Sequence, residues 1–371
     1  MLKLRTLAVI FAFVGVMALA LAACGDDDDD GGGGGGGGGD SGGGSGSIAL
    51  LLPESKTARY ESQDRPNFER KAKELCADCE IIYSNADQDA AKQQQQAEAA
   101  ITKGAKVLVL DPVDAASAGA IVNRAKQSQI PVISYDRLIT DADIDYYISF
   151  DNEQVGKLQG ESLVKKLTDD GAKGDIIMIN GAPTDNNAKL FKEGAHSVID
   201  GSDFKVAKEY DTPDWSPDKA QQEMEQAITA VGKDGFVGVY AANDGTGGGA
   251  IAAMKGNGID PKTRPTTGQD AELAAIQRIL IGEQYMTVYK AIKAEAEAAA
   301  ELAVALATGE DPPAADDKID NGMKQVPSIL LTPVAVTKDN INDTIIKDKF
   351  WSVDEICTGK YAAGCKEAGI Q

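Results

Sequence analysis

The feature that most constrains the fold is a strict succession of short apolar runs and longer amphipathic stretches. Because the apolar runs do not alternate with polar residues, both faces of the sheet they form are expected to be covered. Strand and helix in regular alternation predict a parallel sheet with helices on both sides. The predicted strands are Ile48–Leu52, Glu80–Tyr83, Val107–Leu110 and Val132–Tyr135, and the helices between them are Pro66–Leu75, Asp89–Lys103 and Ala115–Ser128.

The same succession then begins again and predicts a second sheet of about five strands. Its strands are Tyr147–Phe150, Ile176–Ile179, Phe204–Ala207, Phe236–Ala241 and Pro265–Thr267, separated by helices at Glu153–Leu167, Asn187–Ile199, Pro217–Val231, Gly247–Lys255 and Ala271–Ile281. Met286–Val288 and the alanine-rich helix Ile292–Leu306 are expected to return to the first lobe, and Ser328–Leu331 to cross back again. About 320 residues exceed what a single core usually holds, so we expect an α/β fold with two doubly wound parallel-sheet lobes.

The N-terminus predicts export. Lys3 and Arg5 precede the almost wholly apolar stretch Leu7–Leu21, and Leu21-Ala22-Ala23 leads into Cys24. This arrangement resembles the lipobox of bacterial lipoproteins, which implies that residues 1–23 are a signal peptide and that Cys24 is lipidated. The alternatives are an ordinary signal peptide with an incidental cysteine, or an uncleaved anchor. The apolar run is short for a spanning helix, which needs about 20 residues.

Residues 24–47 are predicted to be a tether. Between Gly25 and Ser47 the chain contains only glycine, aspartate and serine. None of these residues can bury apolar surface, so the segment is expected to be flexible. A glycine-rich segment of this length spans roughly 25 Å as a random coil. It would hold a folded domain away from a membrane.

Charge excludes two classes of partner. The chain carries 37 basic and 58 acidic residues, a net charge of −21, and without the signal and the six linker aspartates the folded part carries about −17. Such a surface argues against nucleic acid and anionic lipid as partners. Contact with a membrane is therefore expected only through the lipid on Cys24.

Four further cysteines favour two disulfides in an exported protein, most simply Cys76–Cys79 and Cys357–Cys365. The rival interpretation of the first pair is a redox or zinc motif. A redox pair should open a helix after a strand, whereas this one follows a helical pattern. There is no second paired motif at zinc spacing and the only histidine is His196, so no metal site is expected.

Polar side chains follow several predicted strands. Ligands bind at the carboxyl ends of strands in such sheets, so these groups converge if the two sheets face each other across a cleft. They are Asp111, Asp136 with Arg137, Asn186 with Asn187, Asn243 with Asp244, and Gln269 with Asp270. Single residues of this kind are also common helix N-caps. Helix capping would account for only one residue of the adjacent pair Asp136 and Arg137. This pair is therefore the stronger candidate for ligand binding.

These residue types suit a free sugar. Each sugar hydroxyl donates and accepts, so a site needs fixed acceptors such as Asp, fixed donors such as Arg and Lys, and bifunctional amides. The apolar faces of a sugar also need flat aromatic surfaces, which Tyr60 and Trp215 could supply. Trp215 precedes a predicted helix and could equally be a core residue.

Several longer motifs lie in a fixed order along the chain: Tyr135–Arg137, Asp141–Asp145, Ile148–Glu153, Asp185–Phe191, Gly268–Asp270, Met286–Lys290, Val326–Ser328 and Leu330–Pro333. Through these motifs nearly all of the stretch Ile48–Lys347 resembles the bacterial D-xylose-binding proteins, which are type I periplasmic binding proteins of sugar ABC transporters. The resemblance implies two lobes joined by a hinge of three crossings. The N-terminal lobe would comprise residues 48–149 and 291–328, and the C-terminal lobe residues 150–290 and 329–350. Residues 351–371, with their cysteine pair, form a tail without a counterpart.

The resemblance also implies a ligand site. Its residues would be Arg59, Tyr60, Asp136 and Arg137 from the first lobe, Asn186, Asn187, Trp215 as the stacking aromatic, Asn243 and Asp270 from the second, and Lys290 at a crossing. Xylose-binding proteins carry Trp where Tyr60 stands. That departure leaves the sugar open, because related proteins bind glucose, galactose or arabinose.

We therefore expect a monomer that a lipid anchors to the outer face of the cell membrane. It would need no cofactor and would not be an enzyme. It would deliver a monosaccharide, with D-xylose as the favoured sugar, to an ABC permease. One alternative is a protein of the same fold that presents its sugar to a sensor. A dehydrogenase is suggested only by Gly245–Ala250, which fits a dinucleotide-binding pattern. A glycosidase would need Asp136 and Asp270 as its acid pair, but Arg137 and Lys290 nearby should keep both acids ionised.

Overall fold

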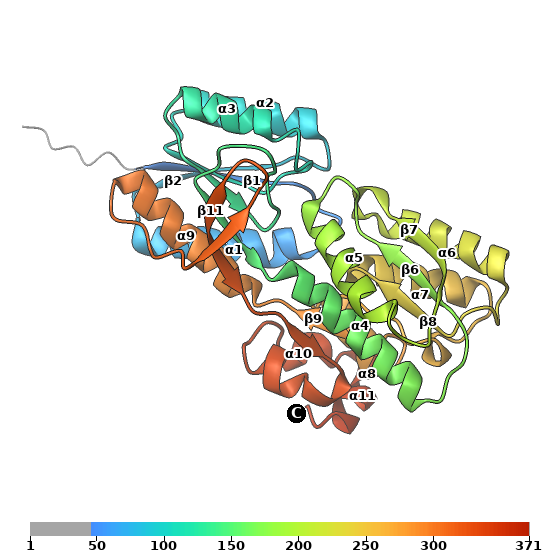
Figure 1. Ribbon diagram of the computed structural model, residues 1–371. Helices are drawn as coiled ribbons and strands as arrows, with labels where there is room; N and C mark the ends of the chain where they lie inside the picture. The colour runs from blue at the N-terminus through green and yellow to red at the C-terminus, as the bar shows by residue number, and fades with distance from the viewer. Residues whose placement is uncertain (1–45, 371) are drawn as a thin grey trace, which may run out of the picture. The chain divides into compact units, whose positions relative to one another are not determined.

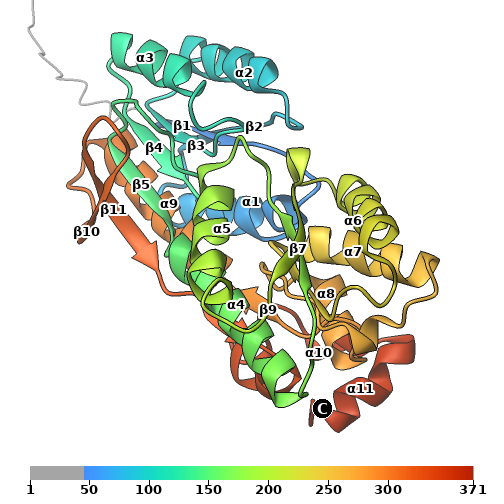
Figure 2. The same ribbon diagram turned by 45° about the vertical axis from the view of Figure 1, so that its right-hand side comes forward.

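The computed structural model describes residues 46–370. The expected signal peptide, the expected lipidation site Cys24 and nearly all of the expected tether lie outside the described residues. Within residues 46–370, no helix is both long enough and apolar enough to cross a membrane. Figures 1 and 2 show two sheets, each flanked by helices.

The first sheet has seven strands in the order β10-β11-β5-β4-β3-β1-β2. All neighbours are parallel except β10 and β11, which are antiparallel. The strands are β1 (Ser47–Leu52), β2 (Glu80–Asn85), β3 (Val107–Leu110), β4 (Val132–Tyr135), β5 (Tyr146–Phe150), β10 (Asp317–Asp320) and β11 (Gln325–Leu331). Every residue of β3 and β4 is buried, as expected for central strands covered on both faces.

Helices cover both faces of this sheet. One hydrophobic cluster joins it to α2 (Ala90–Thr102) and α3 (Gly119–Gln127), and another joins it to α1 (Arg65–Leu75) and α9 (Ile292–Thr308). The two pairs lie on opposite sides of the strands in Figure 1. The first lobe is therefore doubly wound.

The second sheet is built from β7 (Val206–Asp211), β6 (Ile176–Asn180) and β8 (Gly238–Ala241), in that order. Isolated bridges from Val239 to Thr266 and from Gln269 to Val288 extend it to β9 (Thr287–Tyr289), which pairs antiparallel with β12 (Val334–Val336). Its helices are α4 (Asn152–Asp169), α5 (Asn186–Ile199), α6 (Pro217–Val231), α7 (Asp244–Gly256) and α8 (Leu273–Leu280). The first two share one hydrophobic cluster with the sheet, and α6 and α7 share another.

The chain passes between the lobes three times, from β5 to α4, from β9 to α9, and from β11 to β12. The expected fold class is confirmed: two doubly wound lobes joined by three crossings.

Two strands belong to a different sheet than we expected. Tyr147–Phe150 was predicted to open the second sheet, but β5 pairs with β4 and β11 in the first. Ser328–Leu331 was predicted to cross back, but β11 also lies in the first sheet, and the chain crosses only after it. A buried apolar run fits either sheet, so its composition does not decide between them. The expected lobe boundaries at residues 149/150 and 328/329 fall inside these two strands.

Polar edge strands account for the other differences. The predicted strand at residues 204–207 lies instead at Val206–Asp211, because β7 is an edge strand whose residues are half-buried or exposed. The edge strand β10 was not predicted, since Asp317–Asp320 has no apolar run. Pro265–Thr267 forms a single bridge rather than a strand.

The C-terminal tail is a packed part of the second lobe. It contains the short helices α10 (Val353–Ile356) and α11 (Ala362–Glu367), and the buried Ile356, Cys365 and Ile370 share a hydrophobic cluster with α8. The structure contains the disulfides Cys76–Cys79 and Cys357–Cys365. The remaining short helical turns are η1 (Tyr60–Asp64), η2 (Pro213–Trp215), η3 (Pro261–Thr263), η4 (Lys338–Asn340), η5 (Asn342–Ile346) and η6 (Gly359–Tyr361).

Two glycines let α4 and α5 cross closely. A Cβ atom on Gly156 would lie 2.0 Å from the carbonyl oxygen of Phe191, and one on Gly194 would lie 2.1 Å from that of Glu153. Neither backbone can yield without separating the helices. This crossing therefore fixes the position of α5, whose first turns reach the candidate site.

We predict that Gly156→Ala destabilises the protein by about 1–3 kcal/mol, because overpacking against a rigid backbone forces the helices apart. Thermal unfolding followed by circular dichroism measures the effect. Gly256→Ala is the matched control, since no atom lies within 4 Å of its added Cβ. Equal melting temperatures for the two variants would contradict the packing role of Gly156.

Candidate functional site

The carboxyl ends of strands from both sheets line a narrow cavity. Its walls include three cations, three carboxylates, three amides and three aromatic rings. The lining residues are Thr57, Arg59, Tyr60, Asp136, Arg137, Asp185, Asn187, Phe191, Trp215, Asn243, Gln269, Asp270 and Lys290. The free volume between these walls is about 20 Å³, far below the usual range of about 300–1,000 Å³ for ligand pockets, so the walls lie close together.

Nine of the ten expected ligand residues line this cavity, and Asn186 does not. Asn186 lies in a separate hollow beside Tyr147 and Asn321. The reason is helical geometry: neighbouring residues on a helix point about 100° apart, so Asn186 and Asn187 at the start of α5 face different directions.

Arg59 is fixed by a buried carboxylate cluster. Its Nε donates to Asp64 Oδ2 at 2.9 Å, and its guanidinium also donates to Asp64 Oδ1 and Glu295 Oε2, both at 2.6 Å. A further N–H donates to Asp136 Oδ1 at 3.2 Å. The hydroxyl of Tyr135 also donates to Asp64. One guanidinium thus holds three acidic side chains in fixed positions.

Asp136 receives a second donor from Tyr60, whose hydroxyl lies 2.9 Å from Oδ2. Burial alone would raise the pKa of Asp136, but the charges of Arg59, Lys290 and Arg137 lower it to about 2. Asp136 is therefore a fixed anionic acceptor across the physiological pH range. Lys290 Nζ lies 2.9 Å from Asp270 Oδ1, which sets a second acceptor beside a second donor.

Arg137 links the two lobes. From the end of β4 its Nε lies 3.1 Å from Asp185 Oδ2, which comes from the end of β6. The same carboxylate accepts a hydrogen bond from Trp215 Nε1 at 3.0 Å. Arg137 also lies 3.6 Å from carboxylate oxygens of Asp111 and Glu54. Asp111, singled out by its position after a strand, thus stands behind Arg137 and does not line the cavity.

Two amides come from helix starts on the second lobe. Asn187 Nδ2 donates to the carbonyl oxygen of Asp136 at 2.9 Å, a direct contact between the lobes. Asn243 caps α7: its Oδ1 accepts from the backbone of Thr246 at 2.8 Å. Asn243 is therefore both a helix cap and a cavity residue, so the two interpretations of such residues are compatible.

The aromatic residues form the remaining walls. Trp215 is only 4% exposed and packs against Gly181, where a Cβ would lie 2.0 Å from the indole ring. Phe191 meets it edge to face at 6.3 Å between ring centroids. Trp215 therefore lines the cavity and belongs to the core as well.

Three cavity residues have left-handed backbone conformations: Asp136 (φ 53°), Trp215 (φ 52°) and Asp270 (φ 88°). Such conformations are uncommon for residues other than glycine, asparagine and aspartate, and persist where surrounding contacts impose them. Their concentration here indicates that the backbone is shaped to aim these side chains.

Sequence reasoning missed the residues that support this site. Phe191 lies one helical turn after Asn187, so its spacing on α5 could have revealed it. Glu295 lies between the buried Ile292 and Ala299 at helical spacing, which places a carboxylate on the buried face of α9. No comparable signal marked Asp64 or Thr57.

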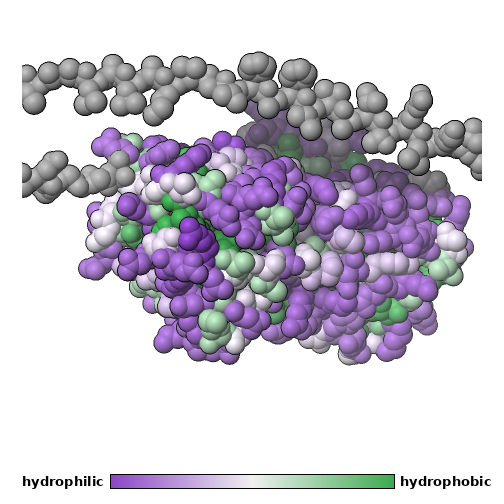
Figure 3. Space-filling view, turned by 90° about the horizontal axis from the view of Figure 1, so that it is seen from above, coloured by the Kyte–Doolittle hydropathy of each residue, from purple (hydrophilic) through white to green (hydrophobic). Residues whose placement is uncertain are grey.

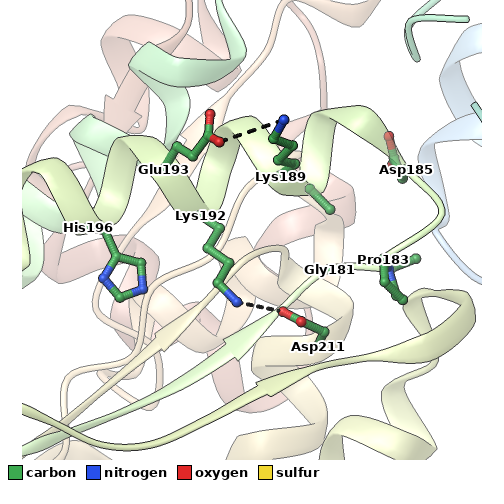
Figure 4. A pocket seen from close by; sticks show the side chains of 10 residues that line it. Gly181, Pro183, Asp185, Lys189, Lys192, Glu193, His196 and Asp211 are labelled. Carbon is green, nitrogen blue, oxygen red and sulfur yellow. Dashed lines mark hydrogen bonds and ion pairs between the residues drawn. The ribbon is translucent and has the colours of Figure 1, made fainter. Parts of the chain in front are cut away.

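A second, more open hollow of about 600 Å³ lies beside α5 and shares Asp185 with the cavity. Figure 4 shows Lys192 directed at Asp211 and Lys189 at Glu193. These charged side chains already pair with one another. The face of the molecule in Figure 3 is mostly polar, in line with the acidic composition.

The rival enzyme patterns have structural explanations. Gly245–Ala250 lies inside α7 rather than in a loop, and a Cβ on Gly249 would lie 2.3 Å from the carbonyl oxygen of Pro217 in α6. Its glycines therefore serve close helix packing. Within residues 46–370, no group of three or more His, Cys, Asp or Glu side chains could hold a metal ion.

Glu272 at the edge of the site supports a pH prediction. Burial and the neighbouring charge of Asp270 raise its pKa from an ordinary 4.5 to about 7. Because the folded-state pKa is the higher one, ionising Glu272 costs stability as pH rises from about 4.5 to 7. We expect Glu272→Gln to raise the melting temperature relative to wild type at pH 8 and to leave it unchanged at pH 4.

Thermal unfolding between pH 4 and pH 8 tests this, with Glu161→Gln as the control on an exposed helix surface. The control should shift the melting temperature equally at all pH values. A Glu272→Gln effect that does not grow with pH would contradict the burial of its charge.

The comparisons with known proteins agree with this architecture. Residues 48–311 match the periplasmic binding protein domain. The chain is 42% identical to the D-xylose-binding periplasmic protein of Escherichia coli strain K12, over 83% of this chain and 92% of that protein. It is 34% identical to the multiple sugar-binding periplasmic receptor ChvE of Rhizobium radiobacter, over 84% of this chain and 92% of that one.

Among solved structures, a solute-binding protein of an ABC transporter from Clostridium phytofermentans, with bound β-D-glucose, superposes with a TM-score of 0.76. It is 31% identical and the match covers 84% of this chain and 99% of that one. These relatives and this fold are those of solute-binding proteins, not of enzymes. With two doubly wound lobes, three crossings and a polar cavity at the facing strand ends, the chain belongs to the periplasmic binding protein family.

Proposed function

We propose that this protein is the extracytoplasmic binding component of a sugar ABC importer, and that it holds one monosaccharide, D-xylose, in the cavity between its lobes. The observation that carries the proposal is the composition of the cavity wall. Fixed anionic acceptors, fixed cationic donors, amides and aromatic rings all converge on this one cavity.

The charges of the wall favour a neutral ligand. Arg59, Arg137 and Lys290 are matched by the carboxylates of Asp136, Asp185 and Asp270. A charged ligand would leave one of these buried groups uncompensated, which is costly. A neutral polyol can instead accept from the cations and donate to the carboxylates.

The polar groups are also held in place before any ligand arrives. Asp136 is fixed by Arg59 and Tyr60, and Asp270 by Lys290. Side chains that are already in place lose little conformational entropy when the ligand binds. Each charge-assisted hydrogen bond to a sugar hydroxyl therefore contributes more to the free energy of binding. Trp215 and Tyr60 offer aromatic surface for the carbon-bound hydrogens of a sugar ring.

The relatives support the choice of sugar. The Escherichia coli relative is named for D-xylose, whereas the Rhizobium radiobacter relative is named for multiple sugars. The former shares the greater identity, 42% against 34%. Tyr60 stands where we expect Trp in xylose-binding proteins, so glucose is the first competitor to test.

Contacts between the lobes suggest how binding is reported to a permease. The Arg137–Asp185 pair and the hydrogen bond from Asn187 to Asp136 both form only when the lobes approach. A sugar that contacts both walls adds to these contacts and shifts an open–closed equilibrium toward closure. We propose that the permease recognises the closed monomer.

We predict that D-xylose raises the melting temperature of the domain beginning at Ile48. A ligand at 100 times its dissociation constant stabilises the native state by about 2.7 kcal/mol. A thermal-shift screen with xylose, glucose, galactose, arabinose, ribose and a nicotinamide cofactor measures the response. A shift with the cofactor alone, or with no sugar even after the protein is unfolded, dialysed and refolded, would contradict the proposal.

Asp136→Ala is the site variant for this screen and should abolish the sugar-dependent shift. Asp203→Ala, an exposed aspartate outside the cavity, is its matched control and should respond like wild type. An unchanged response of Asp136→Ala would remove that residue from the site.

We also propose that Cys24 anchors the mature protein to the outer face of the cell membrane through a lipid. We expect Cys24→Ser to move the protein from the membrane fraction to the soluble extracytoplasmic fraction and to abolish labelling with a fatty-acid analogue. Ala23→Ser, which leaves the cysteine in place, is the control. Labelling that persists in Cys24→Ser would refute the anchor.

A further inference from the structure

We propose that the C-terminal segment, residues 348–370, is a positioning element for the ligand site and that Trp351 is its positioning residue. The segment lies next to α8 in Figures 1 and 2, and none of its residues lines the cavity. It acts through the backbone that presents Asp270 and Lys290. This inference rests on the proposed function, because it concerns affinity for the same ligand.

Trp351 holds the backbone next to Asp270. Its indole Nε1 donates to the carbonyl oxygen of Ala271 at 2.8 Å. Ala271 is fully buried, and it and Asp270 have successive positive φ angles of 50° and 88°. Two consecutive residues in the left-handed region are costly for side chains other than glycine, so outside contacts must impose this conformation.

A second contact reaches the backbone next to Lys290. Tyr289 donates its hydroxyl to Asp348 Oδ2 at 3.1 Å, and its ring meets Phe350 edge to face at 5.2 Å between centroids. Phe350 in turn meets Trp351 at 5.6 Å. The segment therefore contacts Ala271 and Tyr289, the chain neighbours of the two residues in the Asp270–Lys290 ion pair.

The segment is itself firmly attached to α8. Gln277 Nε2 donates to the carbonyl oxygen of Glu355 at 3.2 Å. A Cβ on Gly364 would lie 2.6 Å from the carbonyl oxygen of Leu280, so α11 packs directly on the end of α8. The Cys357–Cys365 disulfide closes the loop between these contacts. A support anchored in this way can hold Ala271 against the preference of its backbone.

The consequence is that the segment sets the direction of Asp270 without touching the cavity. If the Trp351 donor is lost, the buried carbonyl of Ala271 loses its partner and the strained pair can relax. Asp270 would then turn from Lys290 and from the ligand. Affinity would fall although no residue of the cavity wall has changed.

The test is Trp351→Phe, which keeps an aromatic ring and removes the donor. Loss of one hydrogen bond predicts a dissociation constant for D-xylose weaker by about fivefold in titration calorimetry. Ile356→Val is the matched control: it loosens the hydrophobic core of the same segment and leaves the hydrogen bond from Trp351 to Ala271 in place. It should lower the melting temperature and leave the dissociation constant unchanged.

A second measurement follows the wild-type protein and needs only one of two tryptophan variants, for assignment. The chain has only two tryptophans, so nitrogen-15 labelling of tryptophan gives two indole signals, and Trp351→Phe or Trp215→Phe assigns them. The Trp351 indole signal should move when D-xylose saturates wild type. If the Trp351 indole signal does not move, or if Trp351→Phe and wild type bind D-xylose with equal affinity, this inference is wrong while the proposed function stands. A wild type that binds no sugar overturns the proposed function, and the inference with it.

Discussion

The site depends on the burial of one guanidinium. Arg59 is 2% exposed and contacts Asp64, Glu295 and Asp136, which come from three separate parts of the chain. An unpaired charge at this depth would be strongly destabilising, so each carboxylate must be delivered to within hydrogen-bonding distance. The packing of η1, α9 and the end of β4 around Arg59 follows from that requirement. Glu295 shows this dependence most clearly. Burial raises its pKa well above the ordinary value, and the charge of Arg59 opposes that shift.

The network also explains how a polar cavity can be rigid. Its charges form ion pairs with one another and are shielded from solvent, which restricts the rotation of the side chains. Arg137 has the same relation to Asp185, Asp111 and Glu54. Arg59 also lies 3.9 Å from Asp270 of the second lobe, so both arginine-centred clusters hold the cavity wall and join its two halves.

Much of this architecture could be predicted from the sequence, and the failures have physical causes. Buried central elements such as Val107–Leu110 and Pro217–Val231 were predicted to the residue, since burial on both faces or on one helical stripe leaves a clear pattern. Polar edge strands such as β10 leave none. The strand-end rule and the family resemblance led to the cavity wall. The partners of Arg59 could not be predicted, because pairing between distant charges is decided by tertiary packing.

One feature of the first sheet bears on how the chain folds. In the pairing of β5 with β11, Tyr147 stands opposite Ser328, about 180 residues later in the chain. Until β11 arrives, the edge of β5 remains open, and exposed strand edges are prone to pair with other chains. Contacts between residues so far apart in sequence also slow folding. The first lobe therefore cannot be completed during synthesis before residues 152–290, the larger part of the second lobe, have emerged. A chaperone that shields β5 in that interval would protect the nascent protein from aggregation.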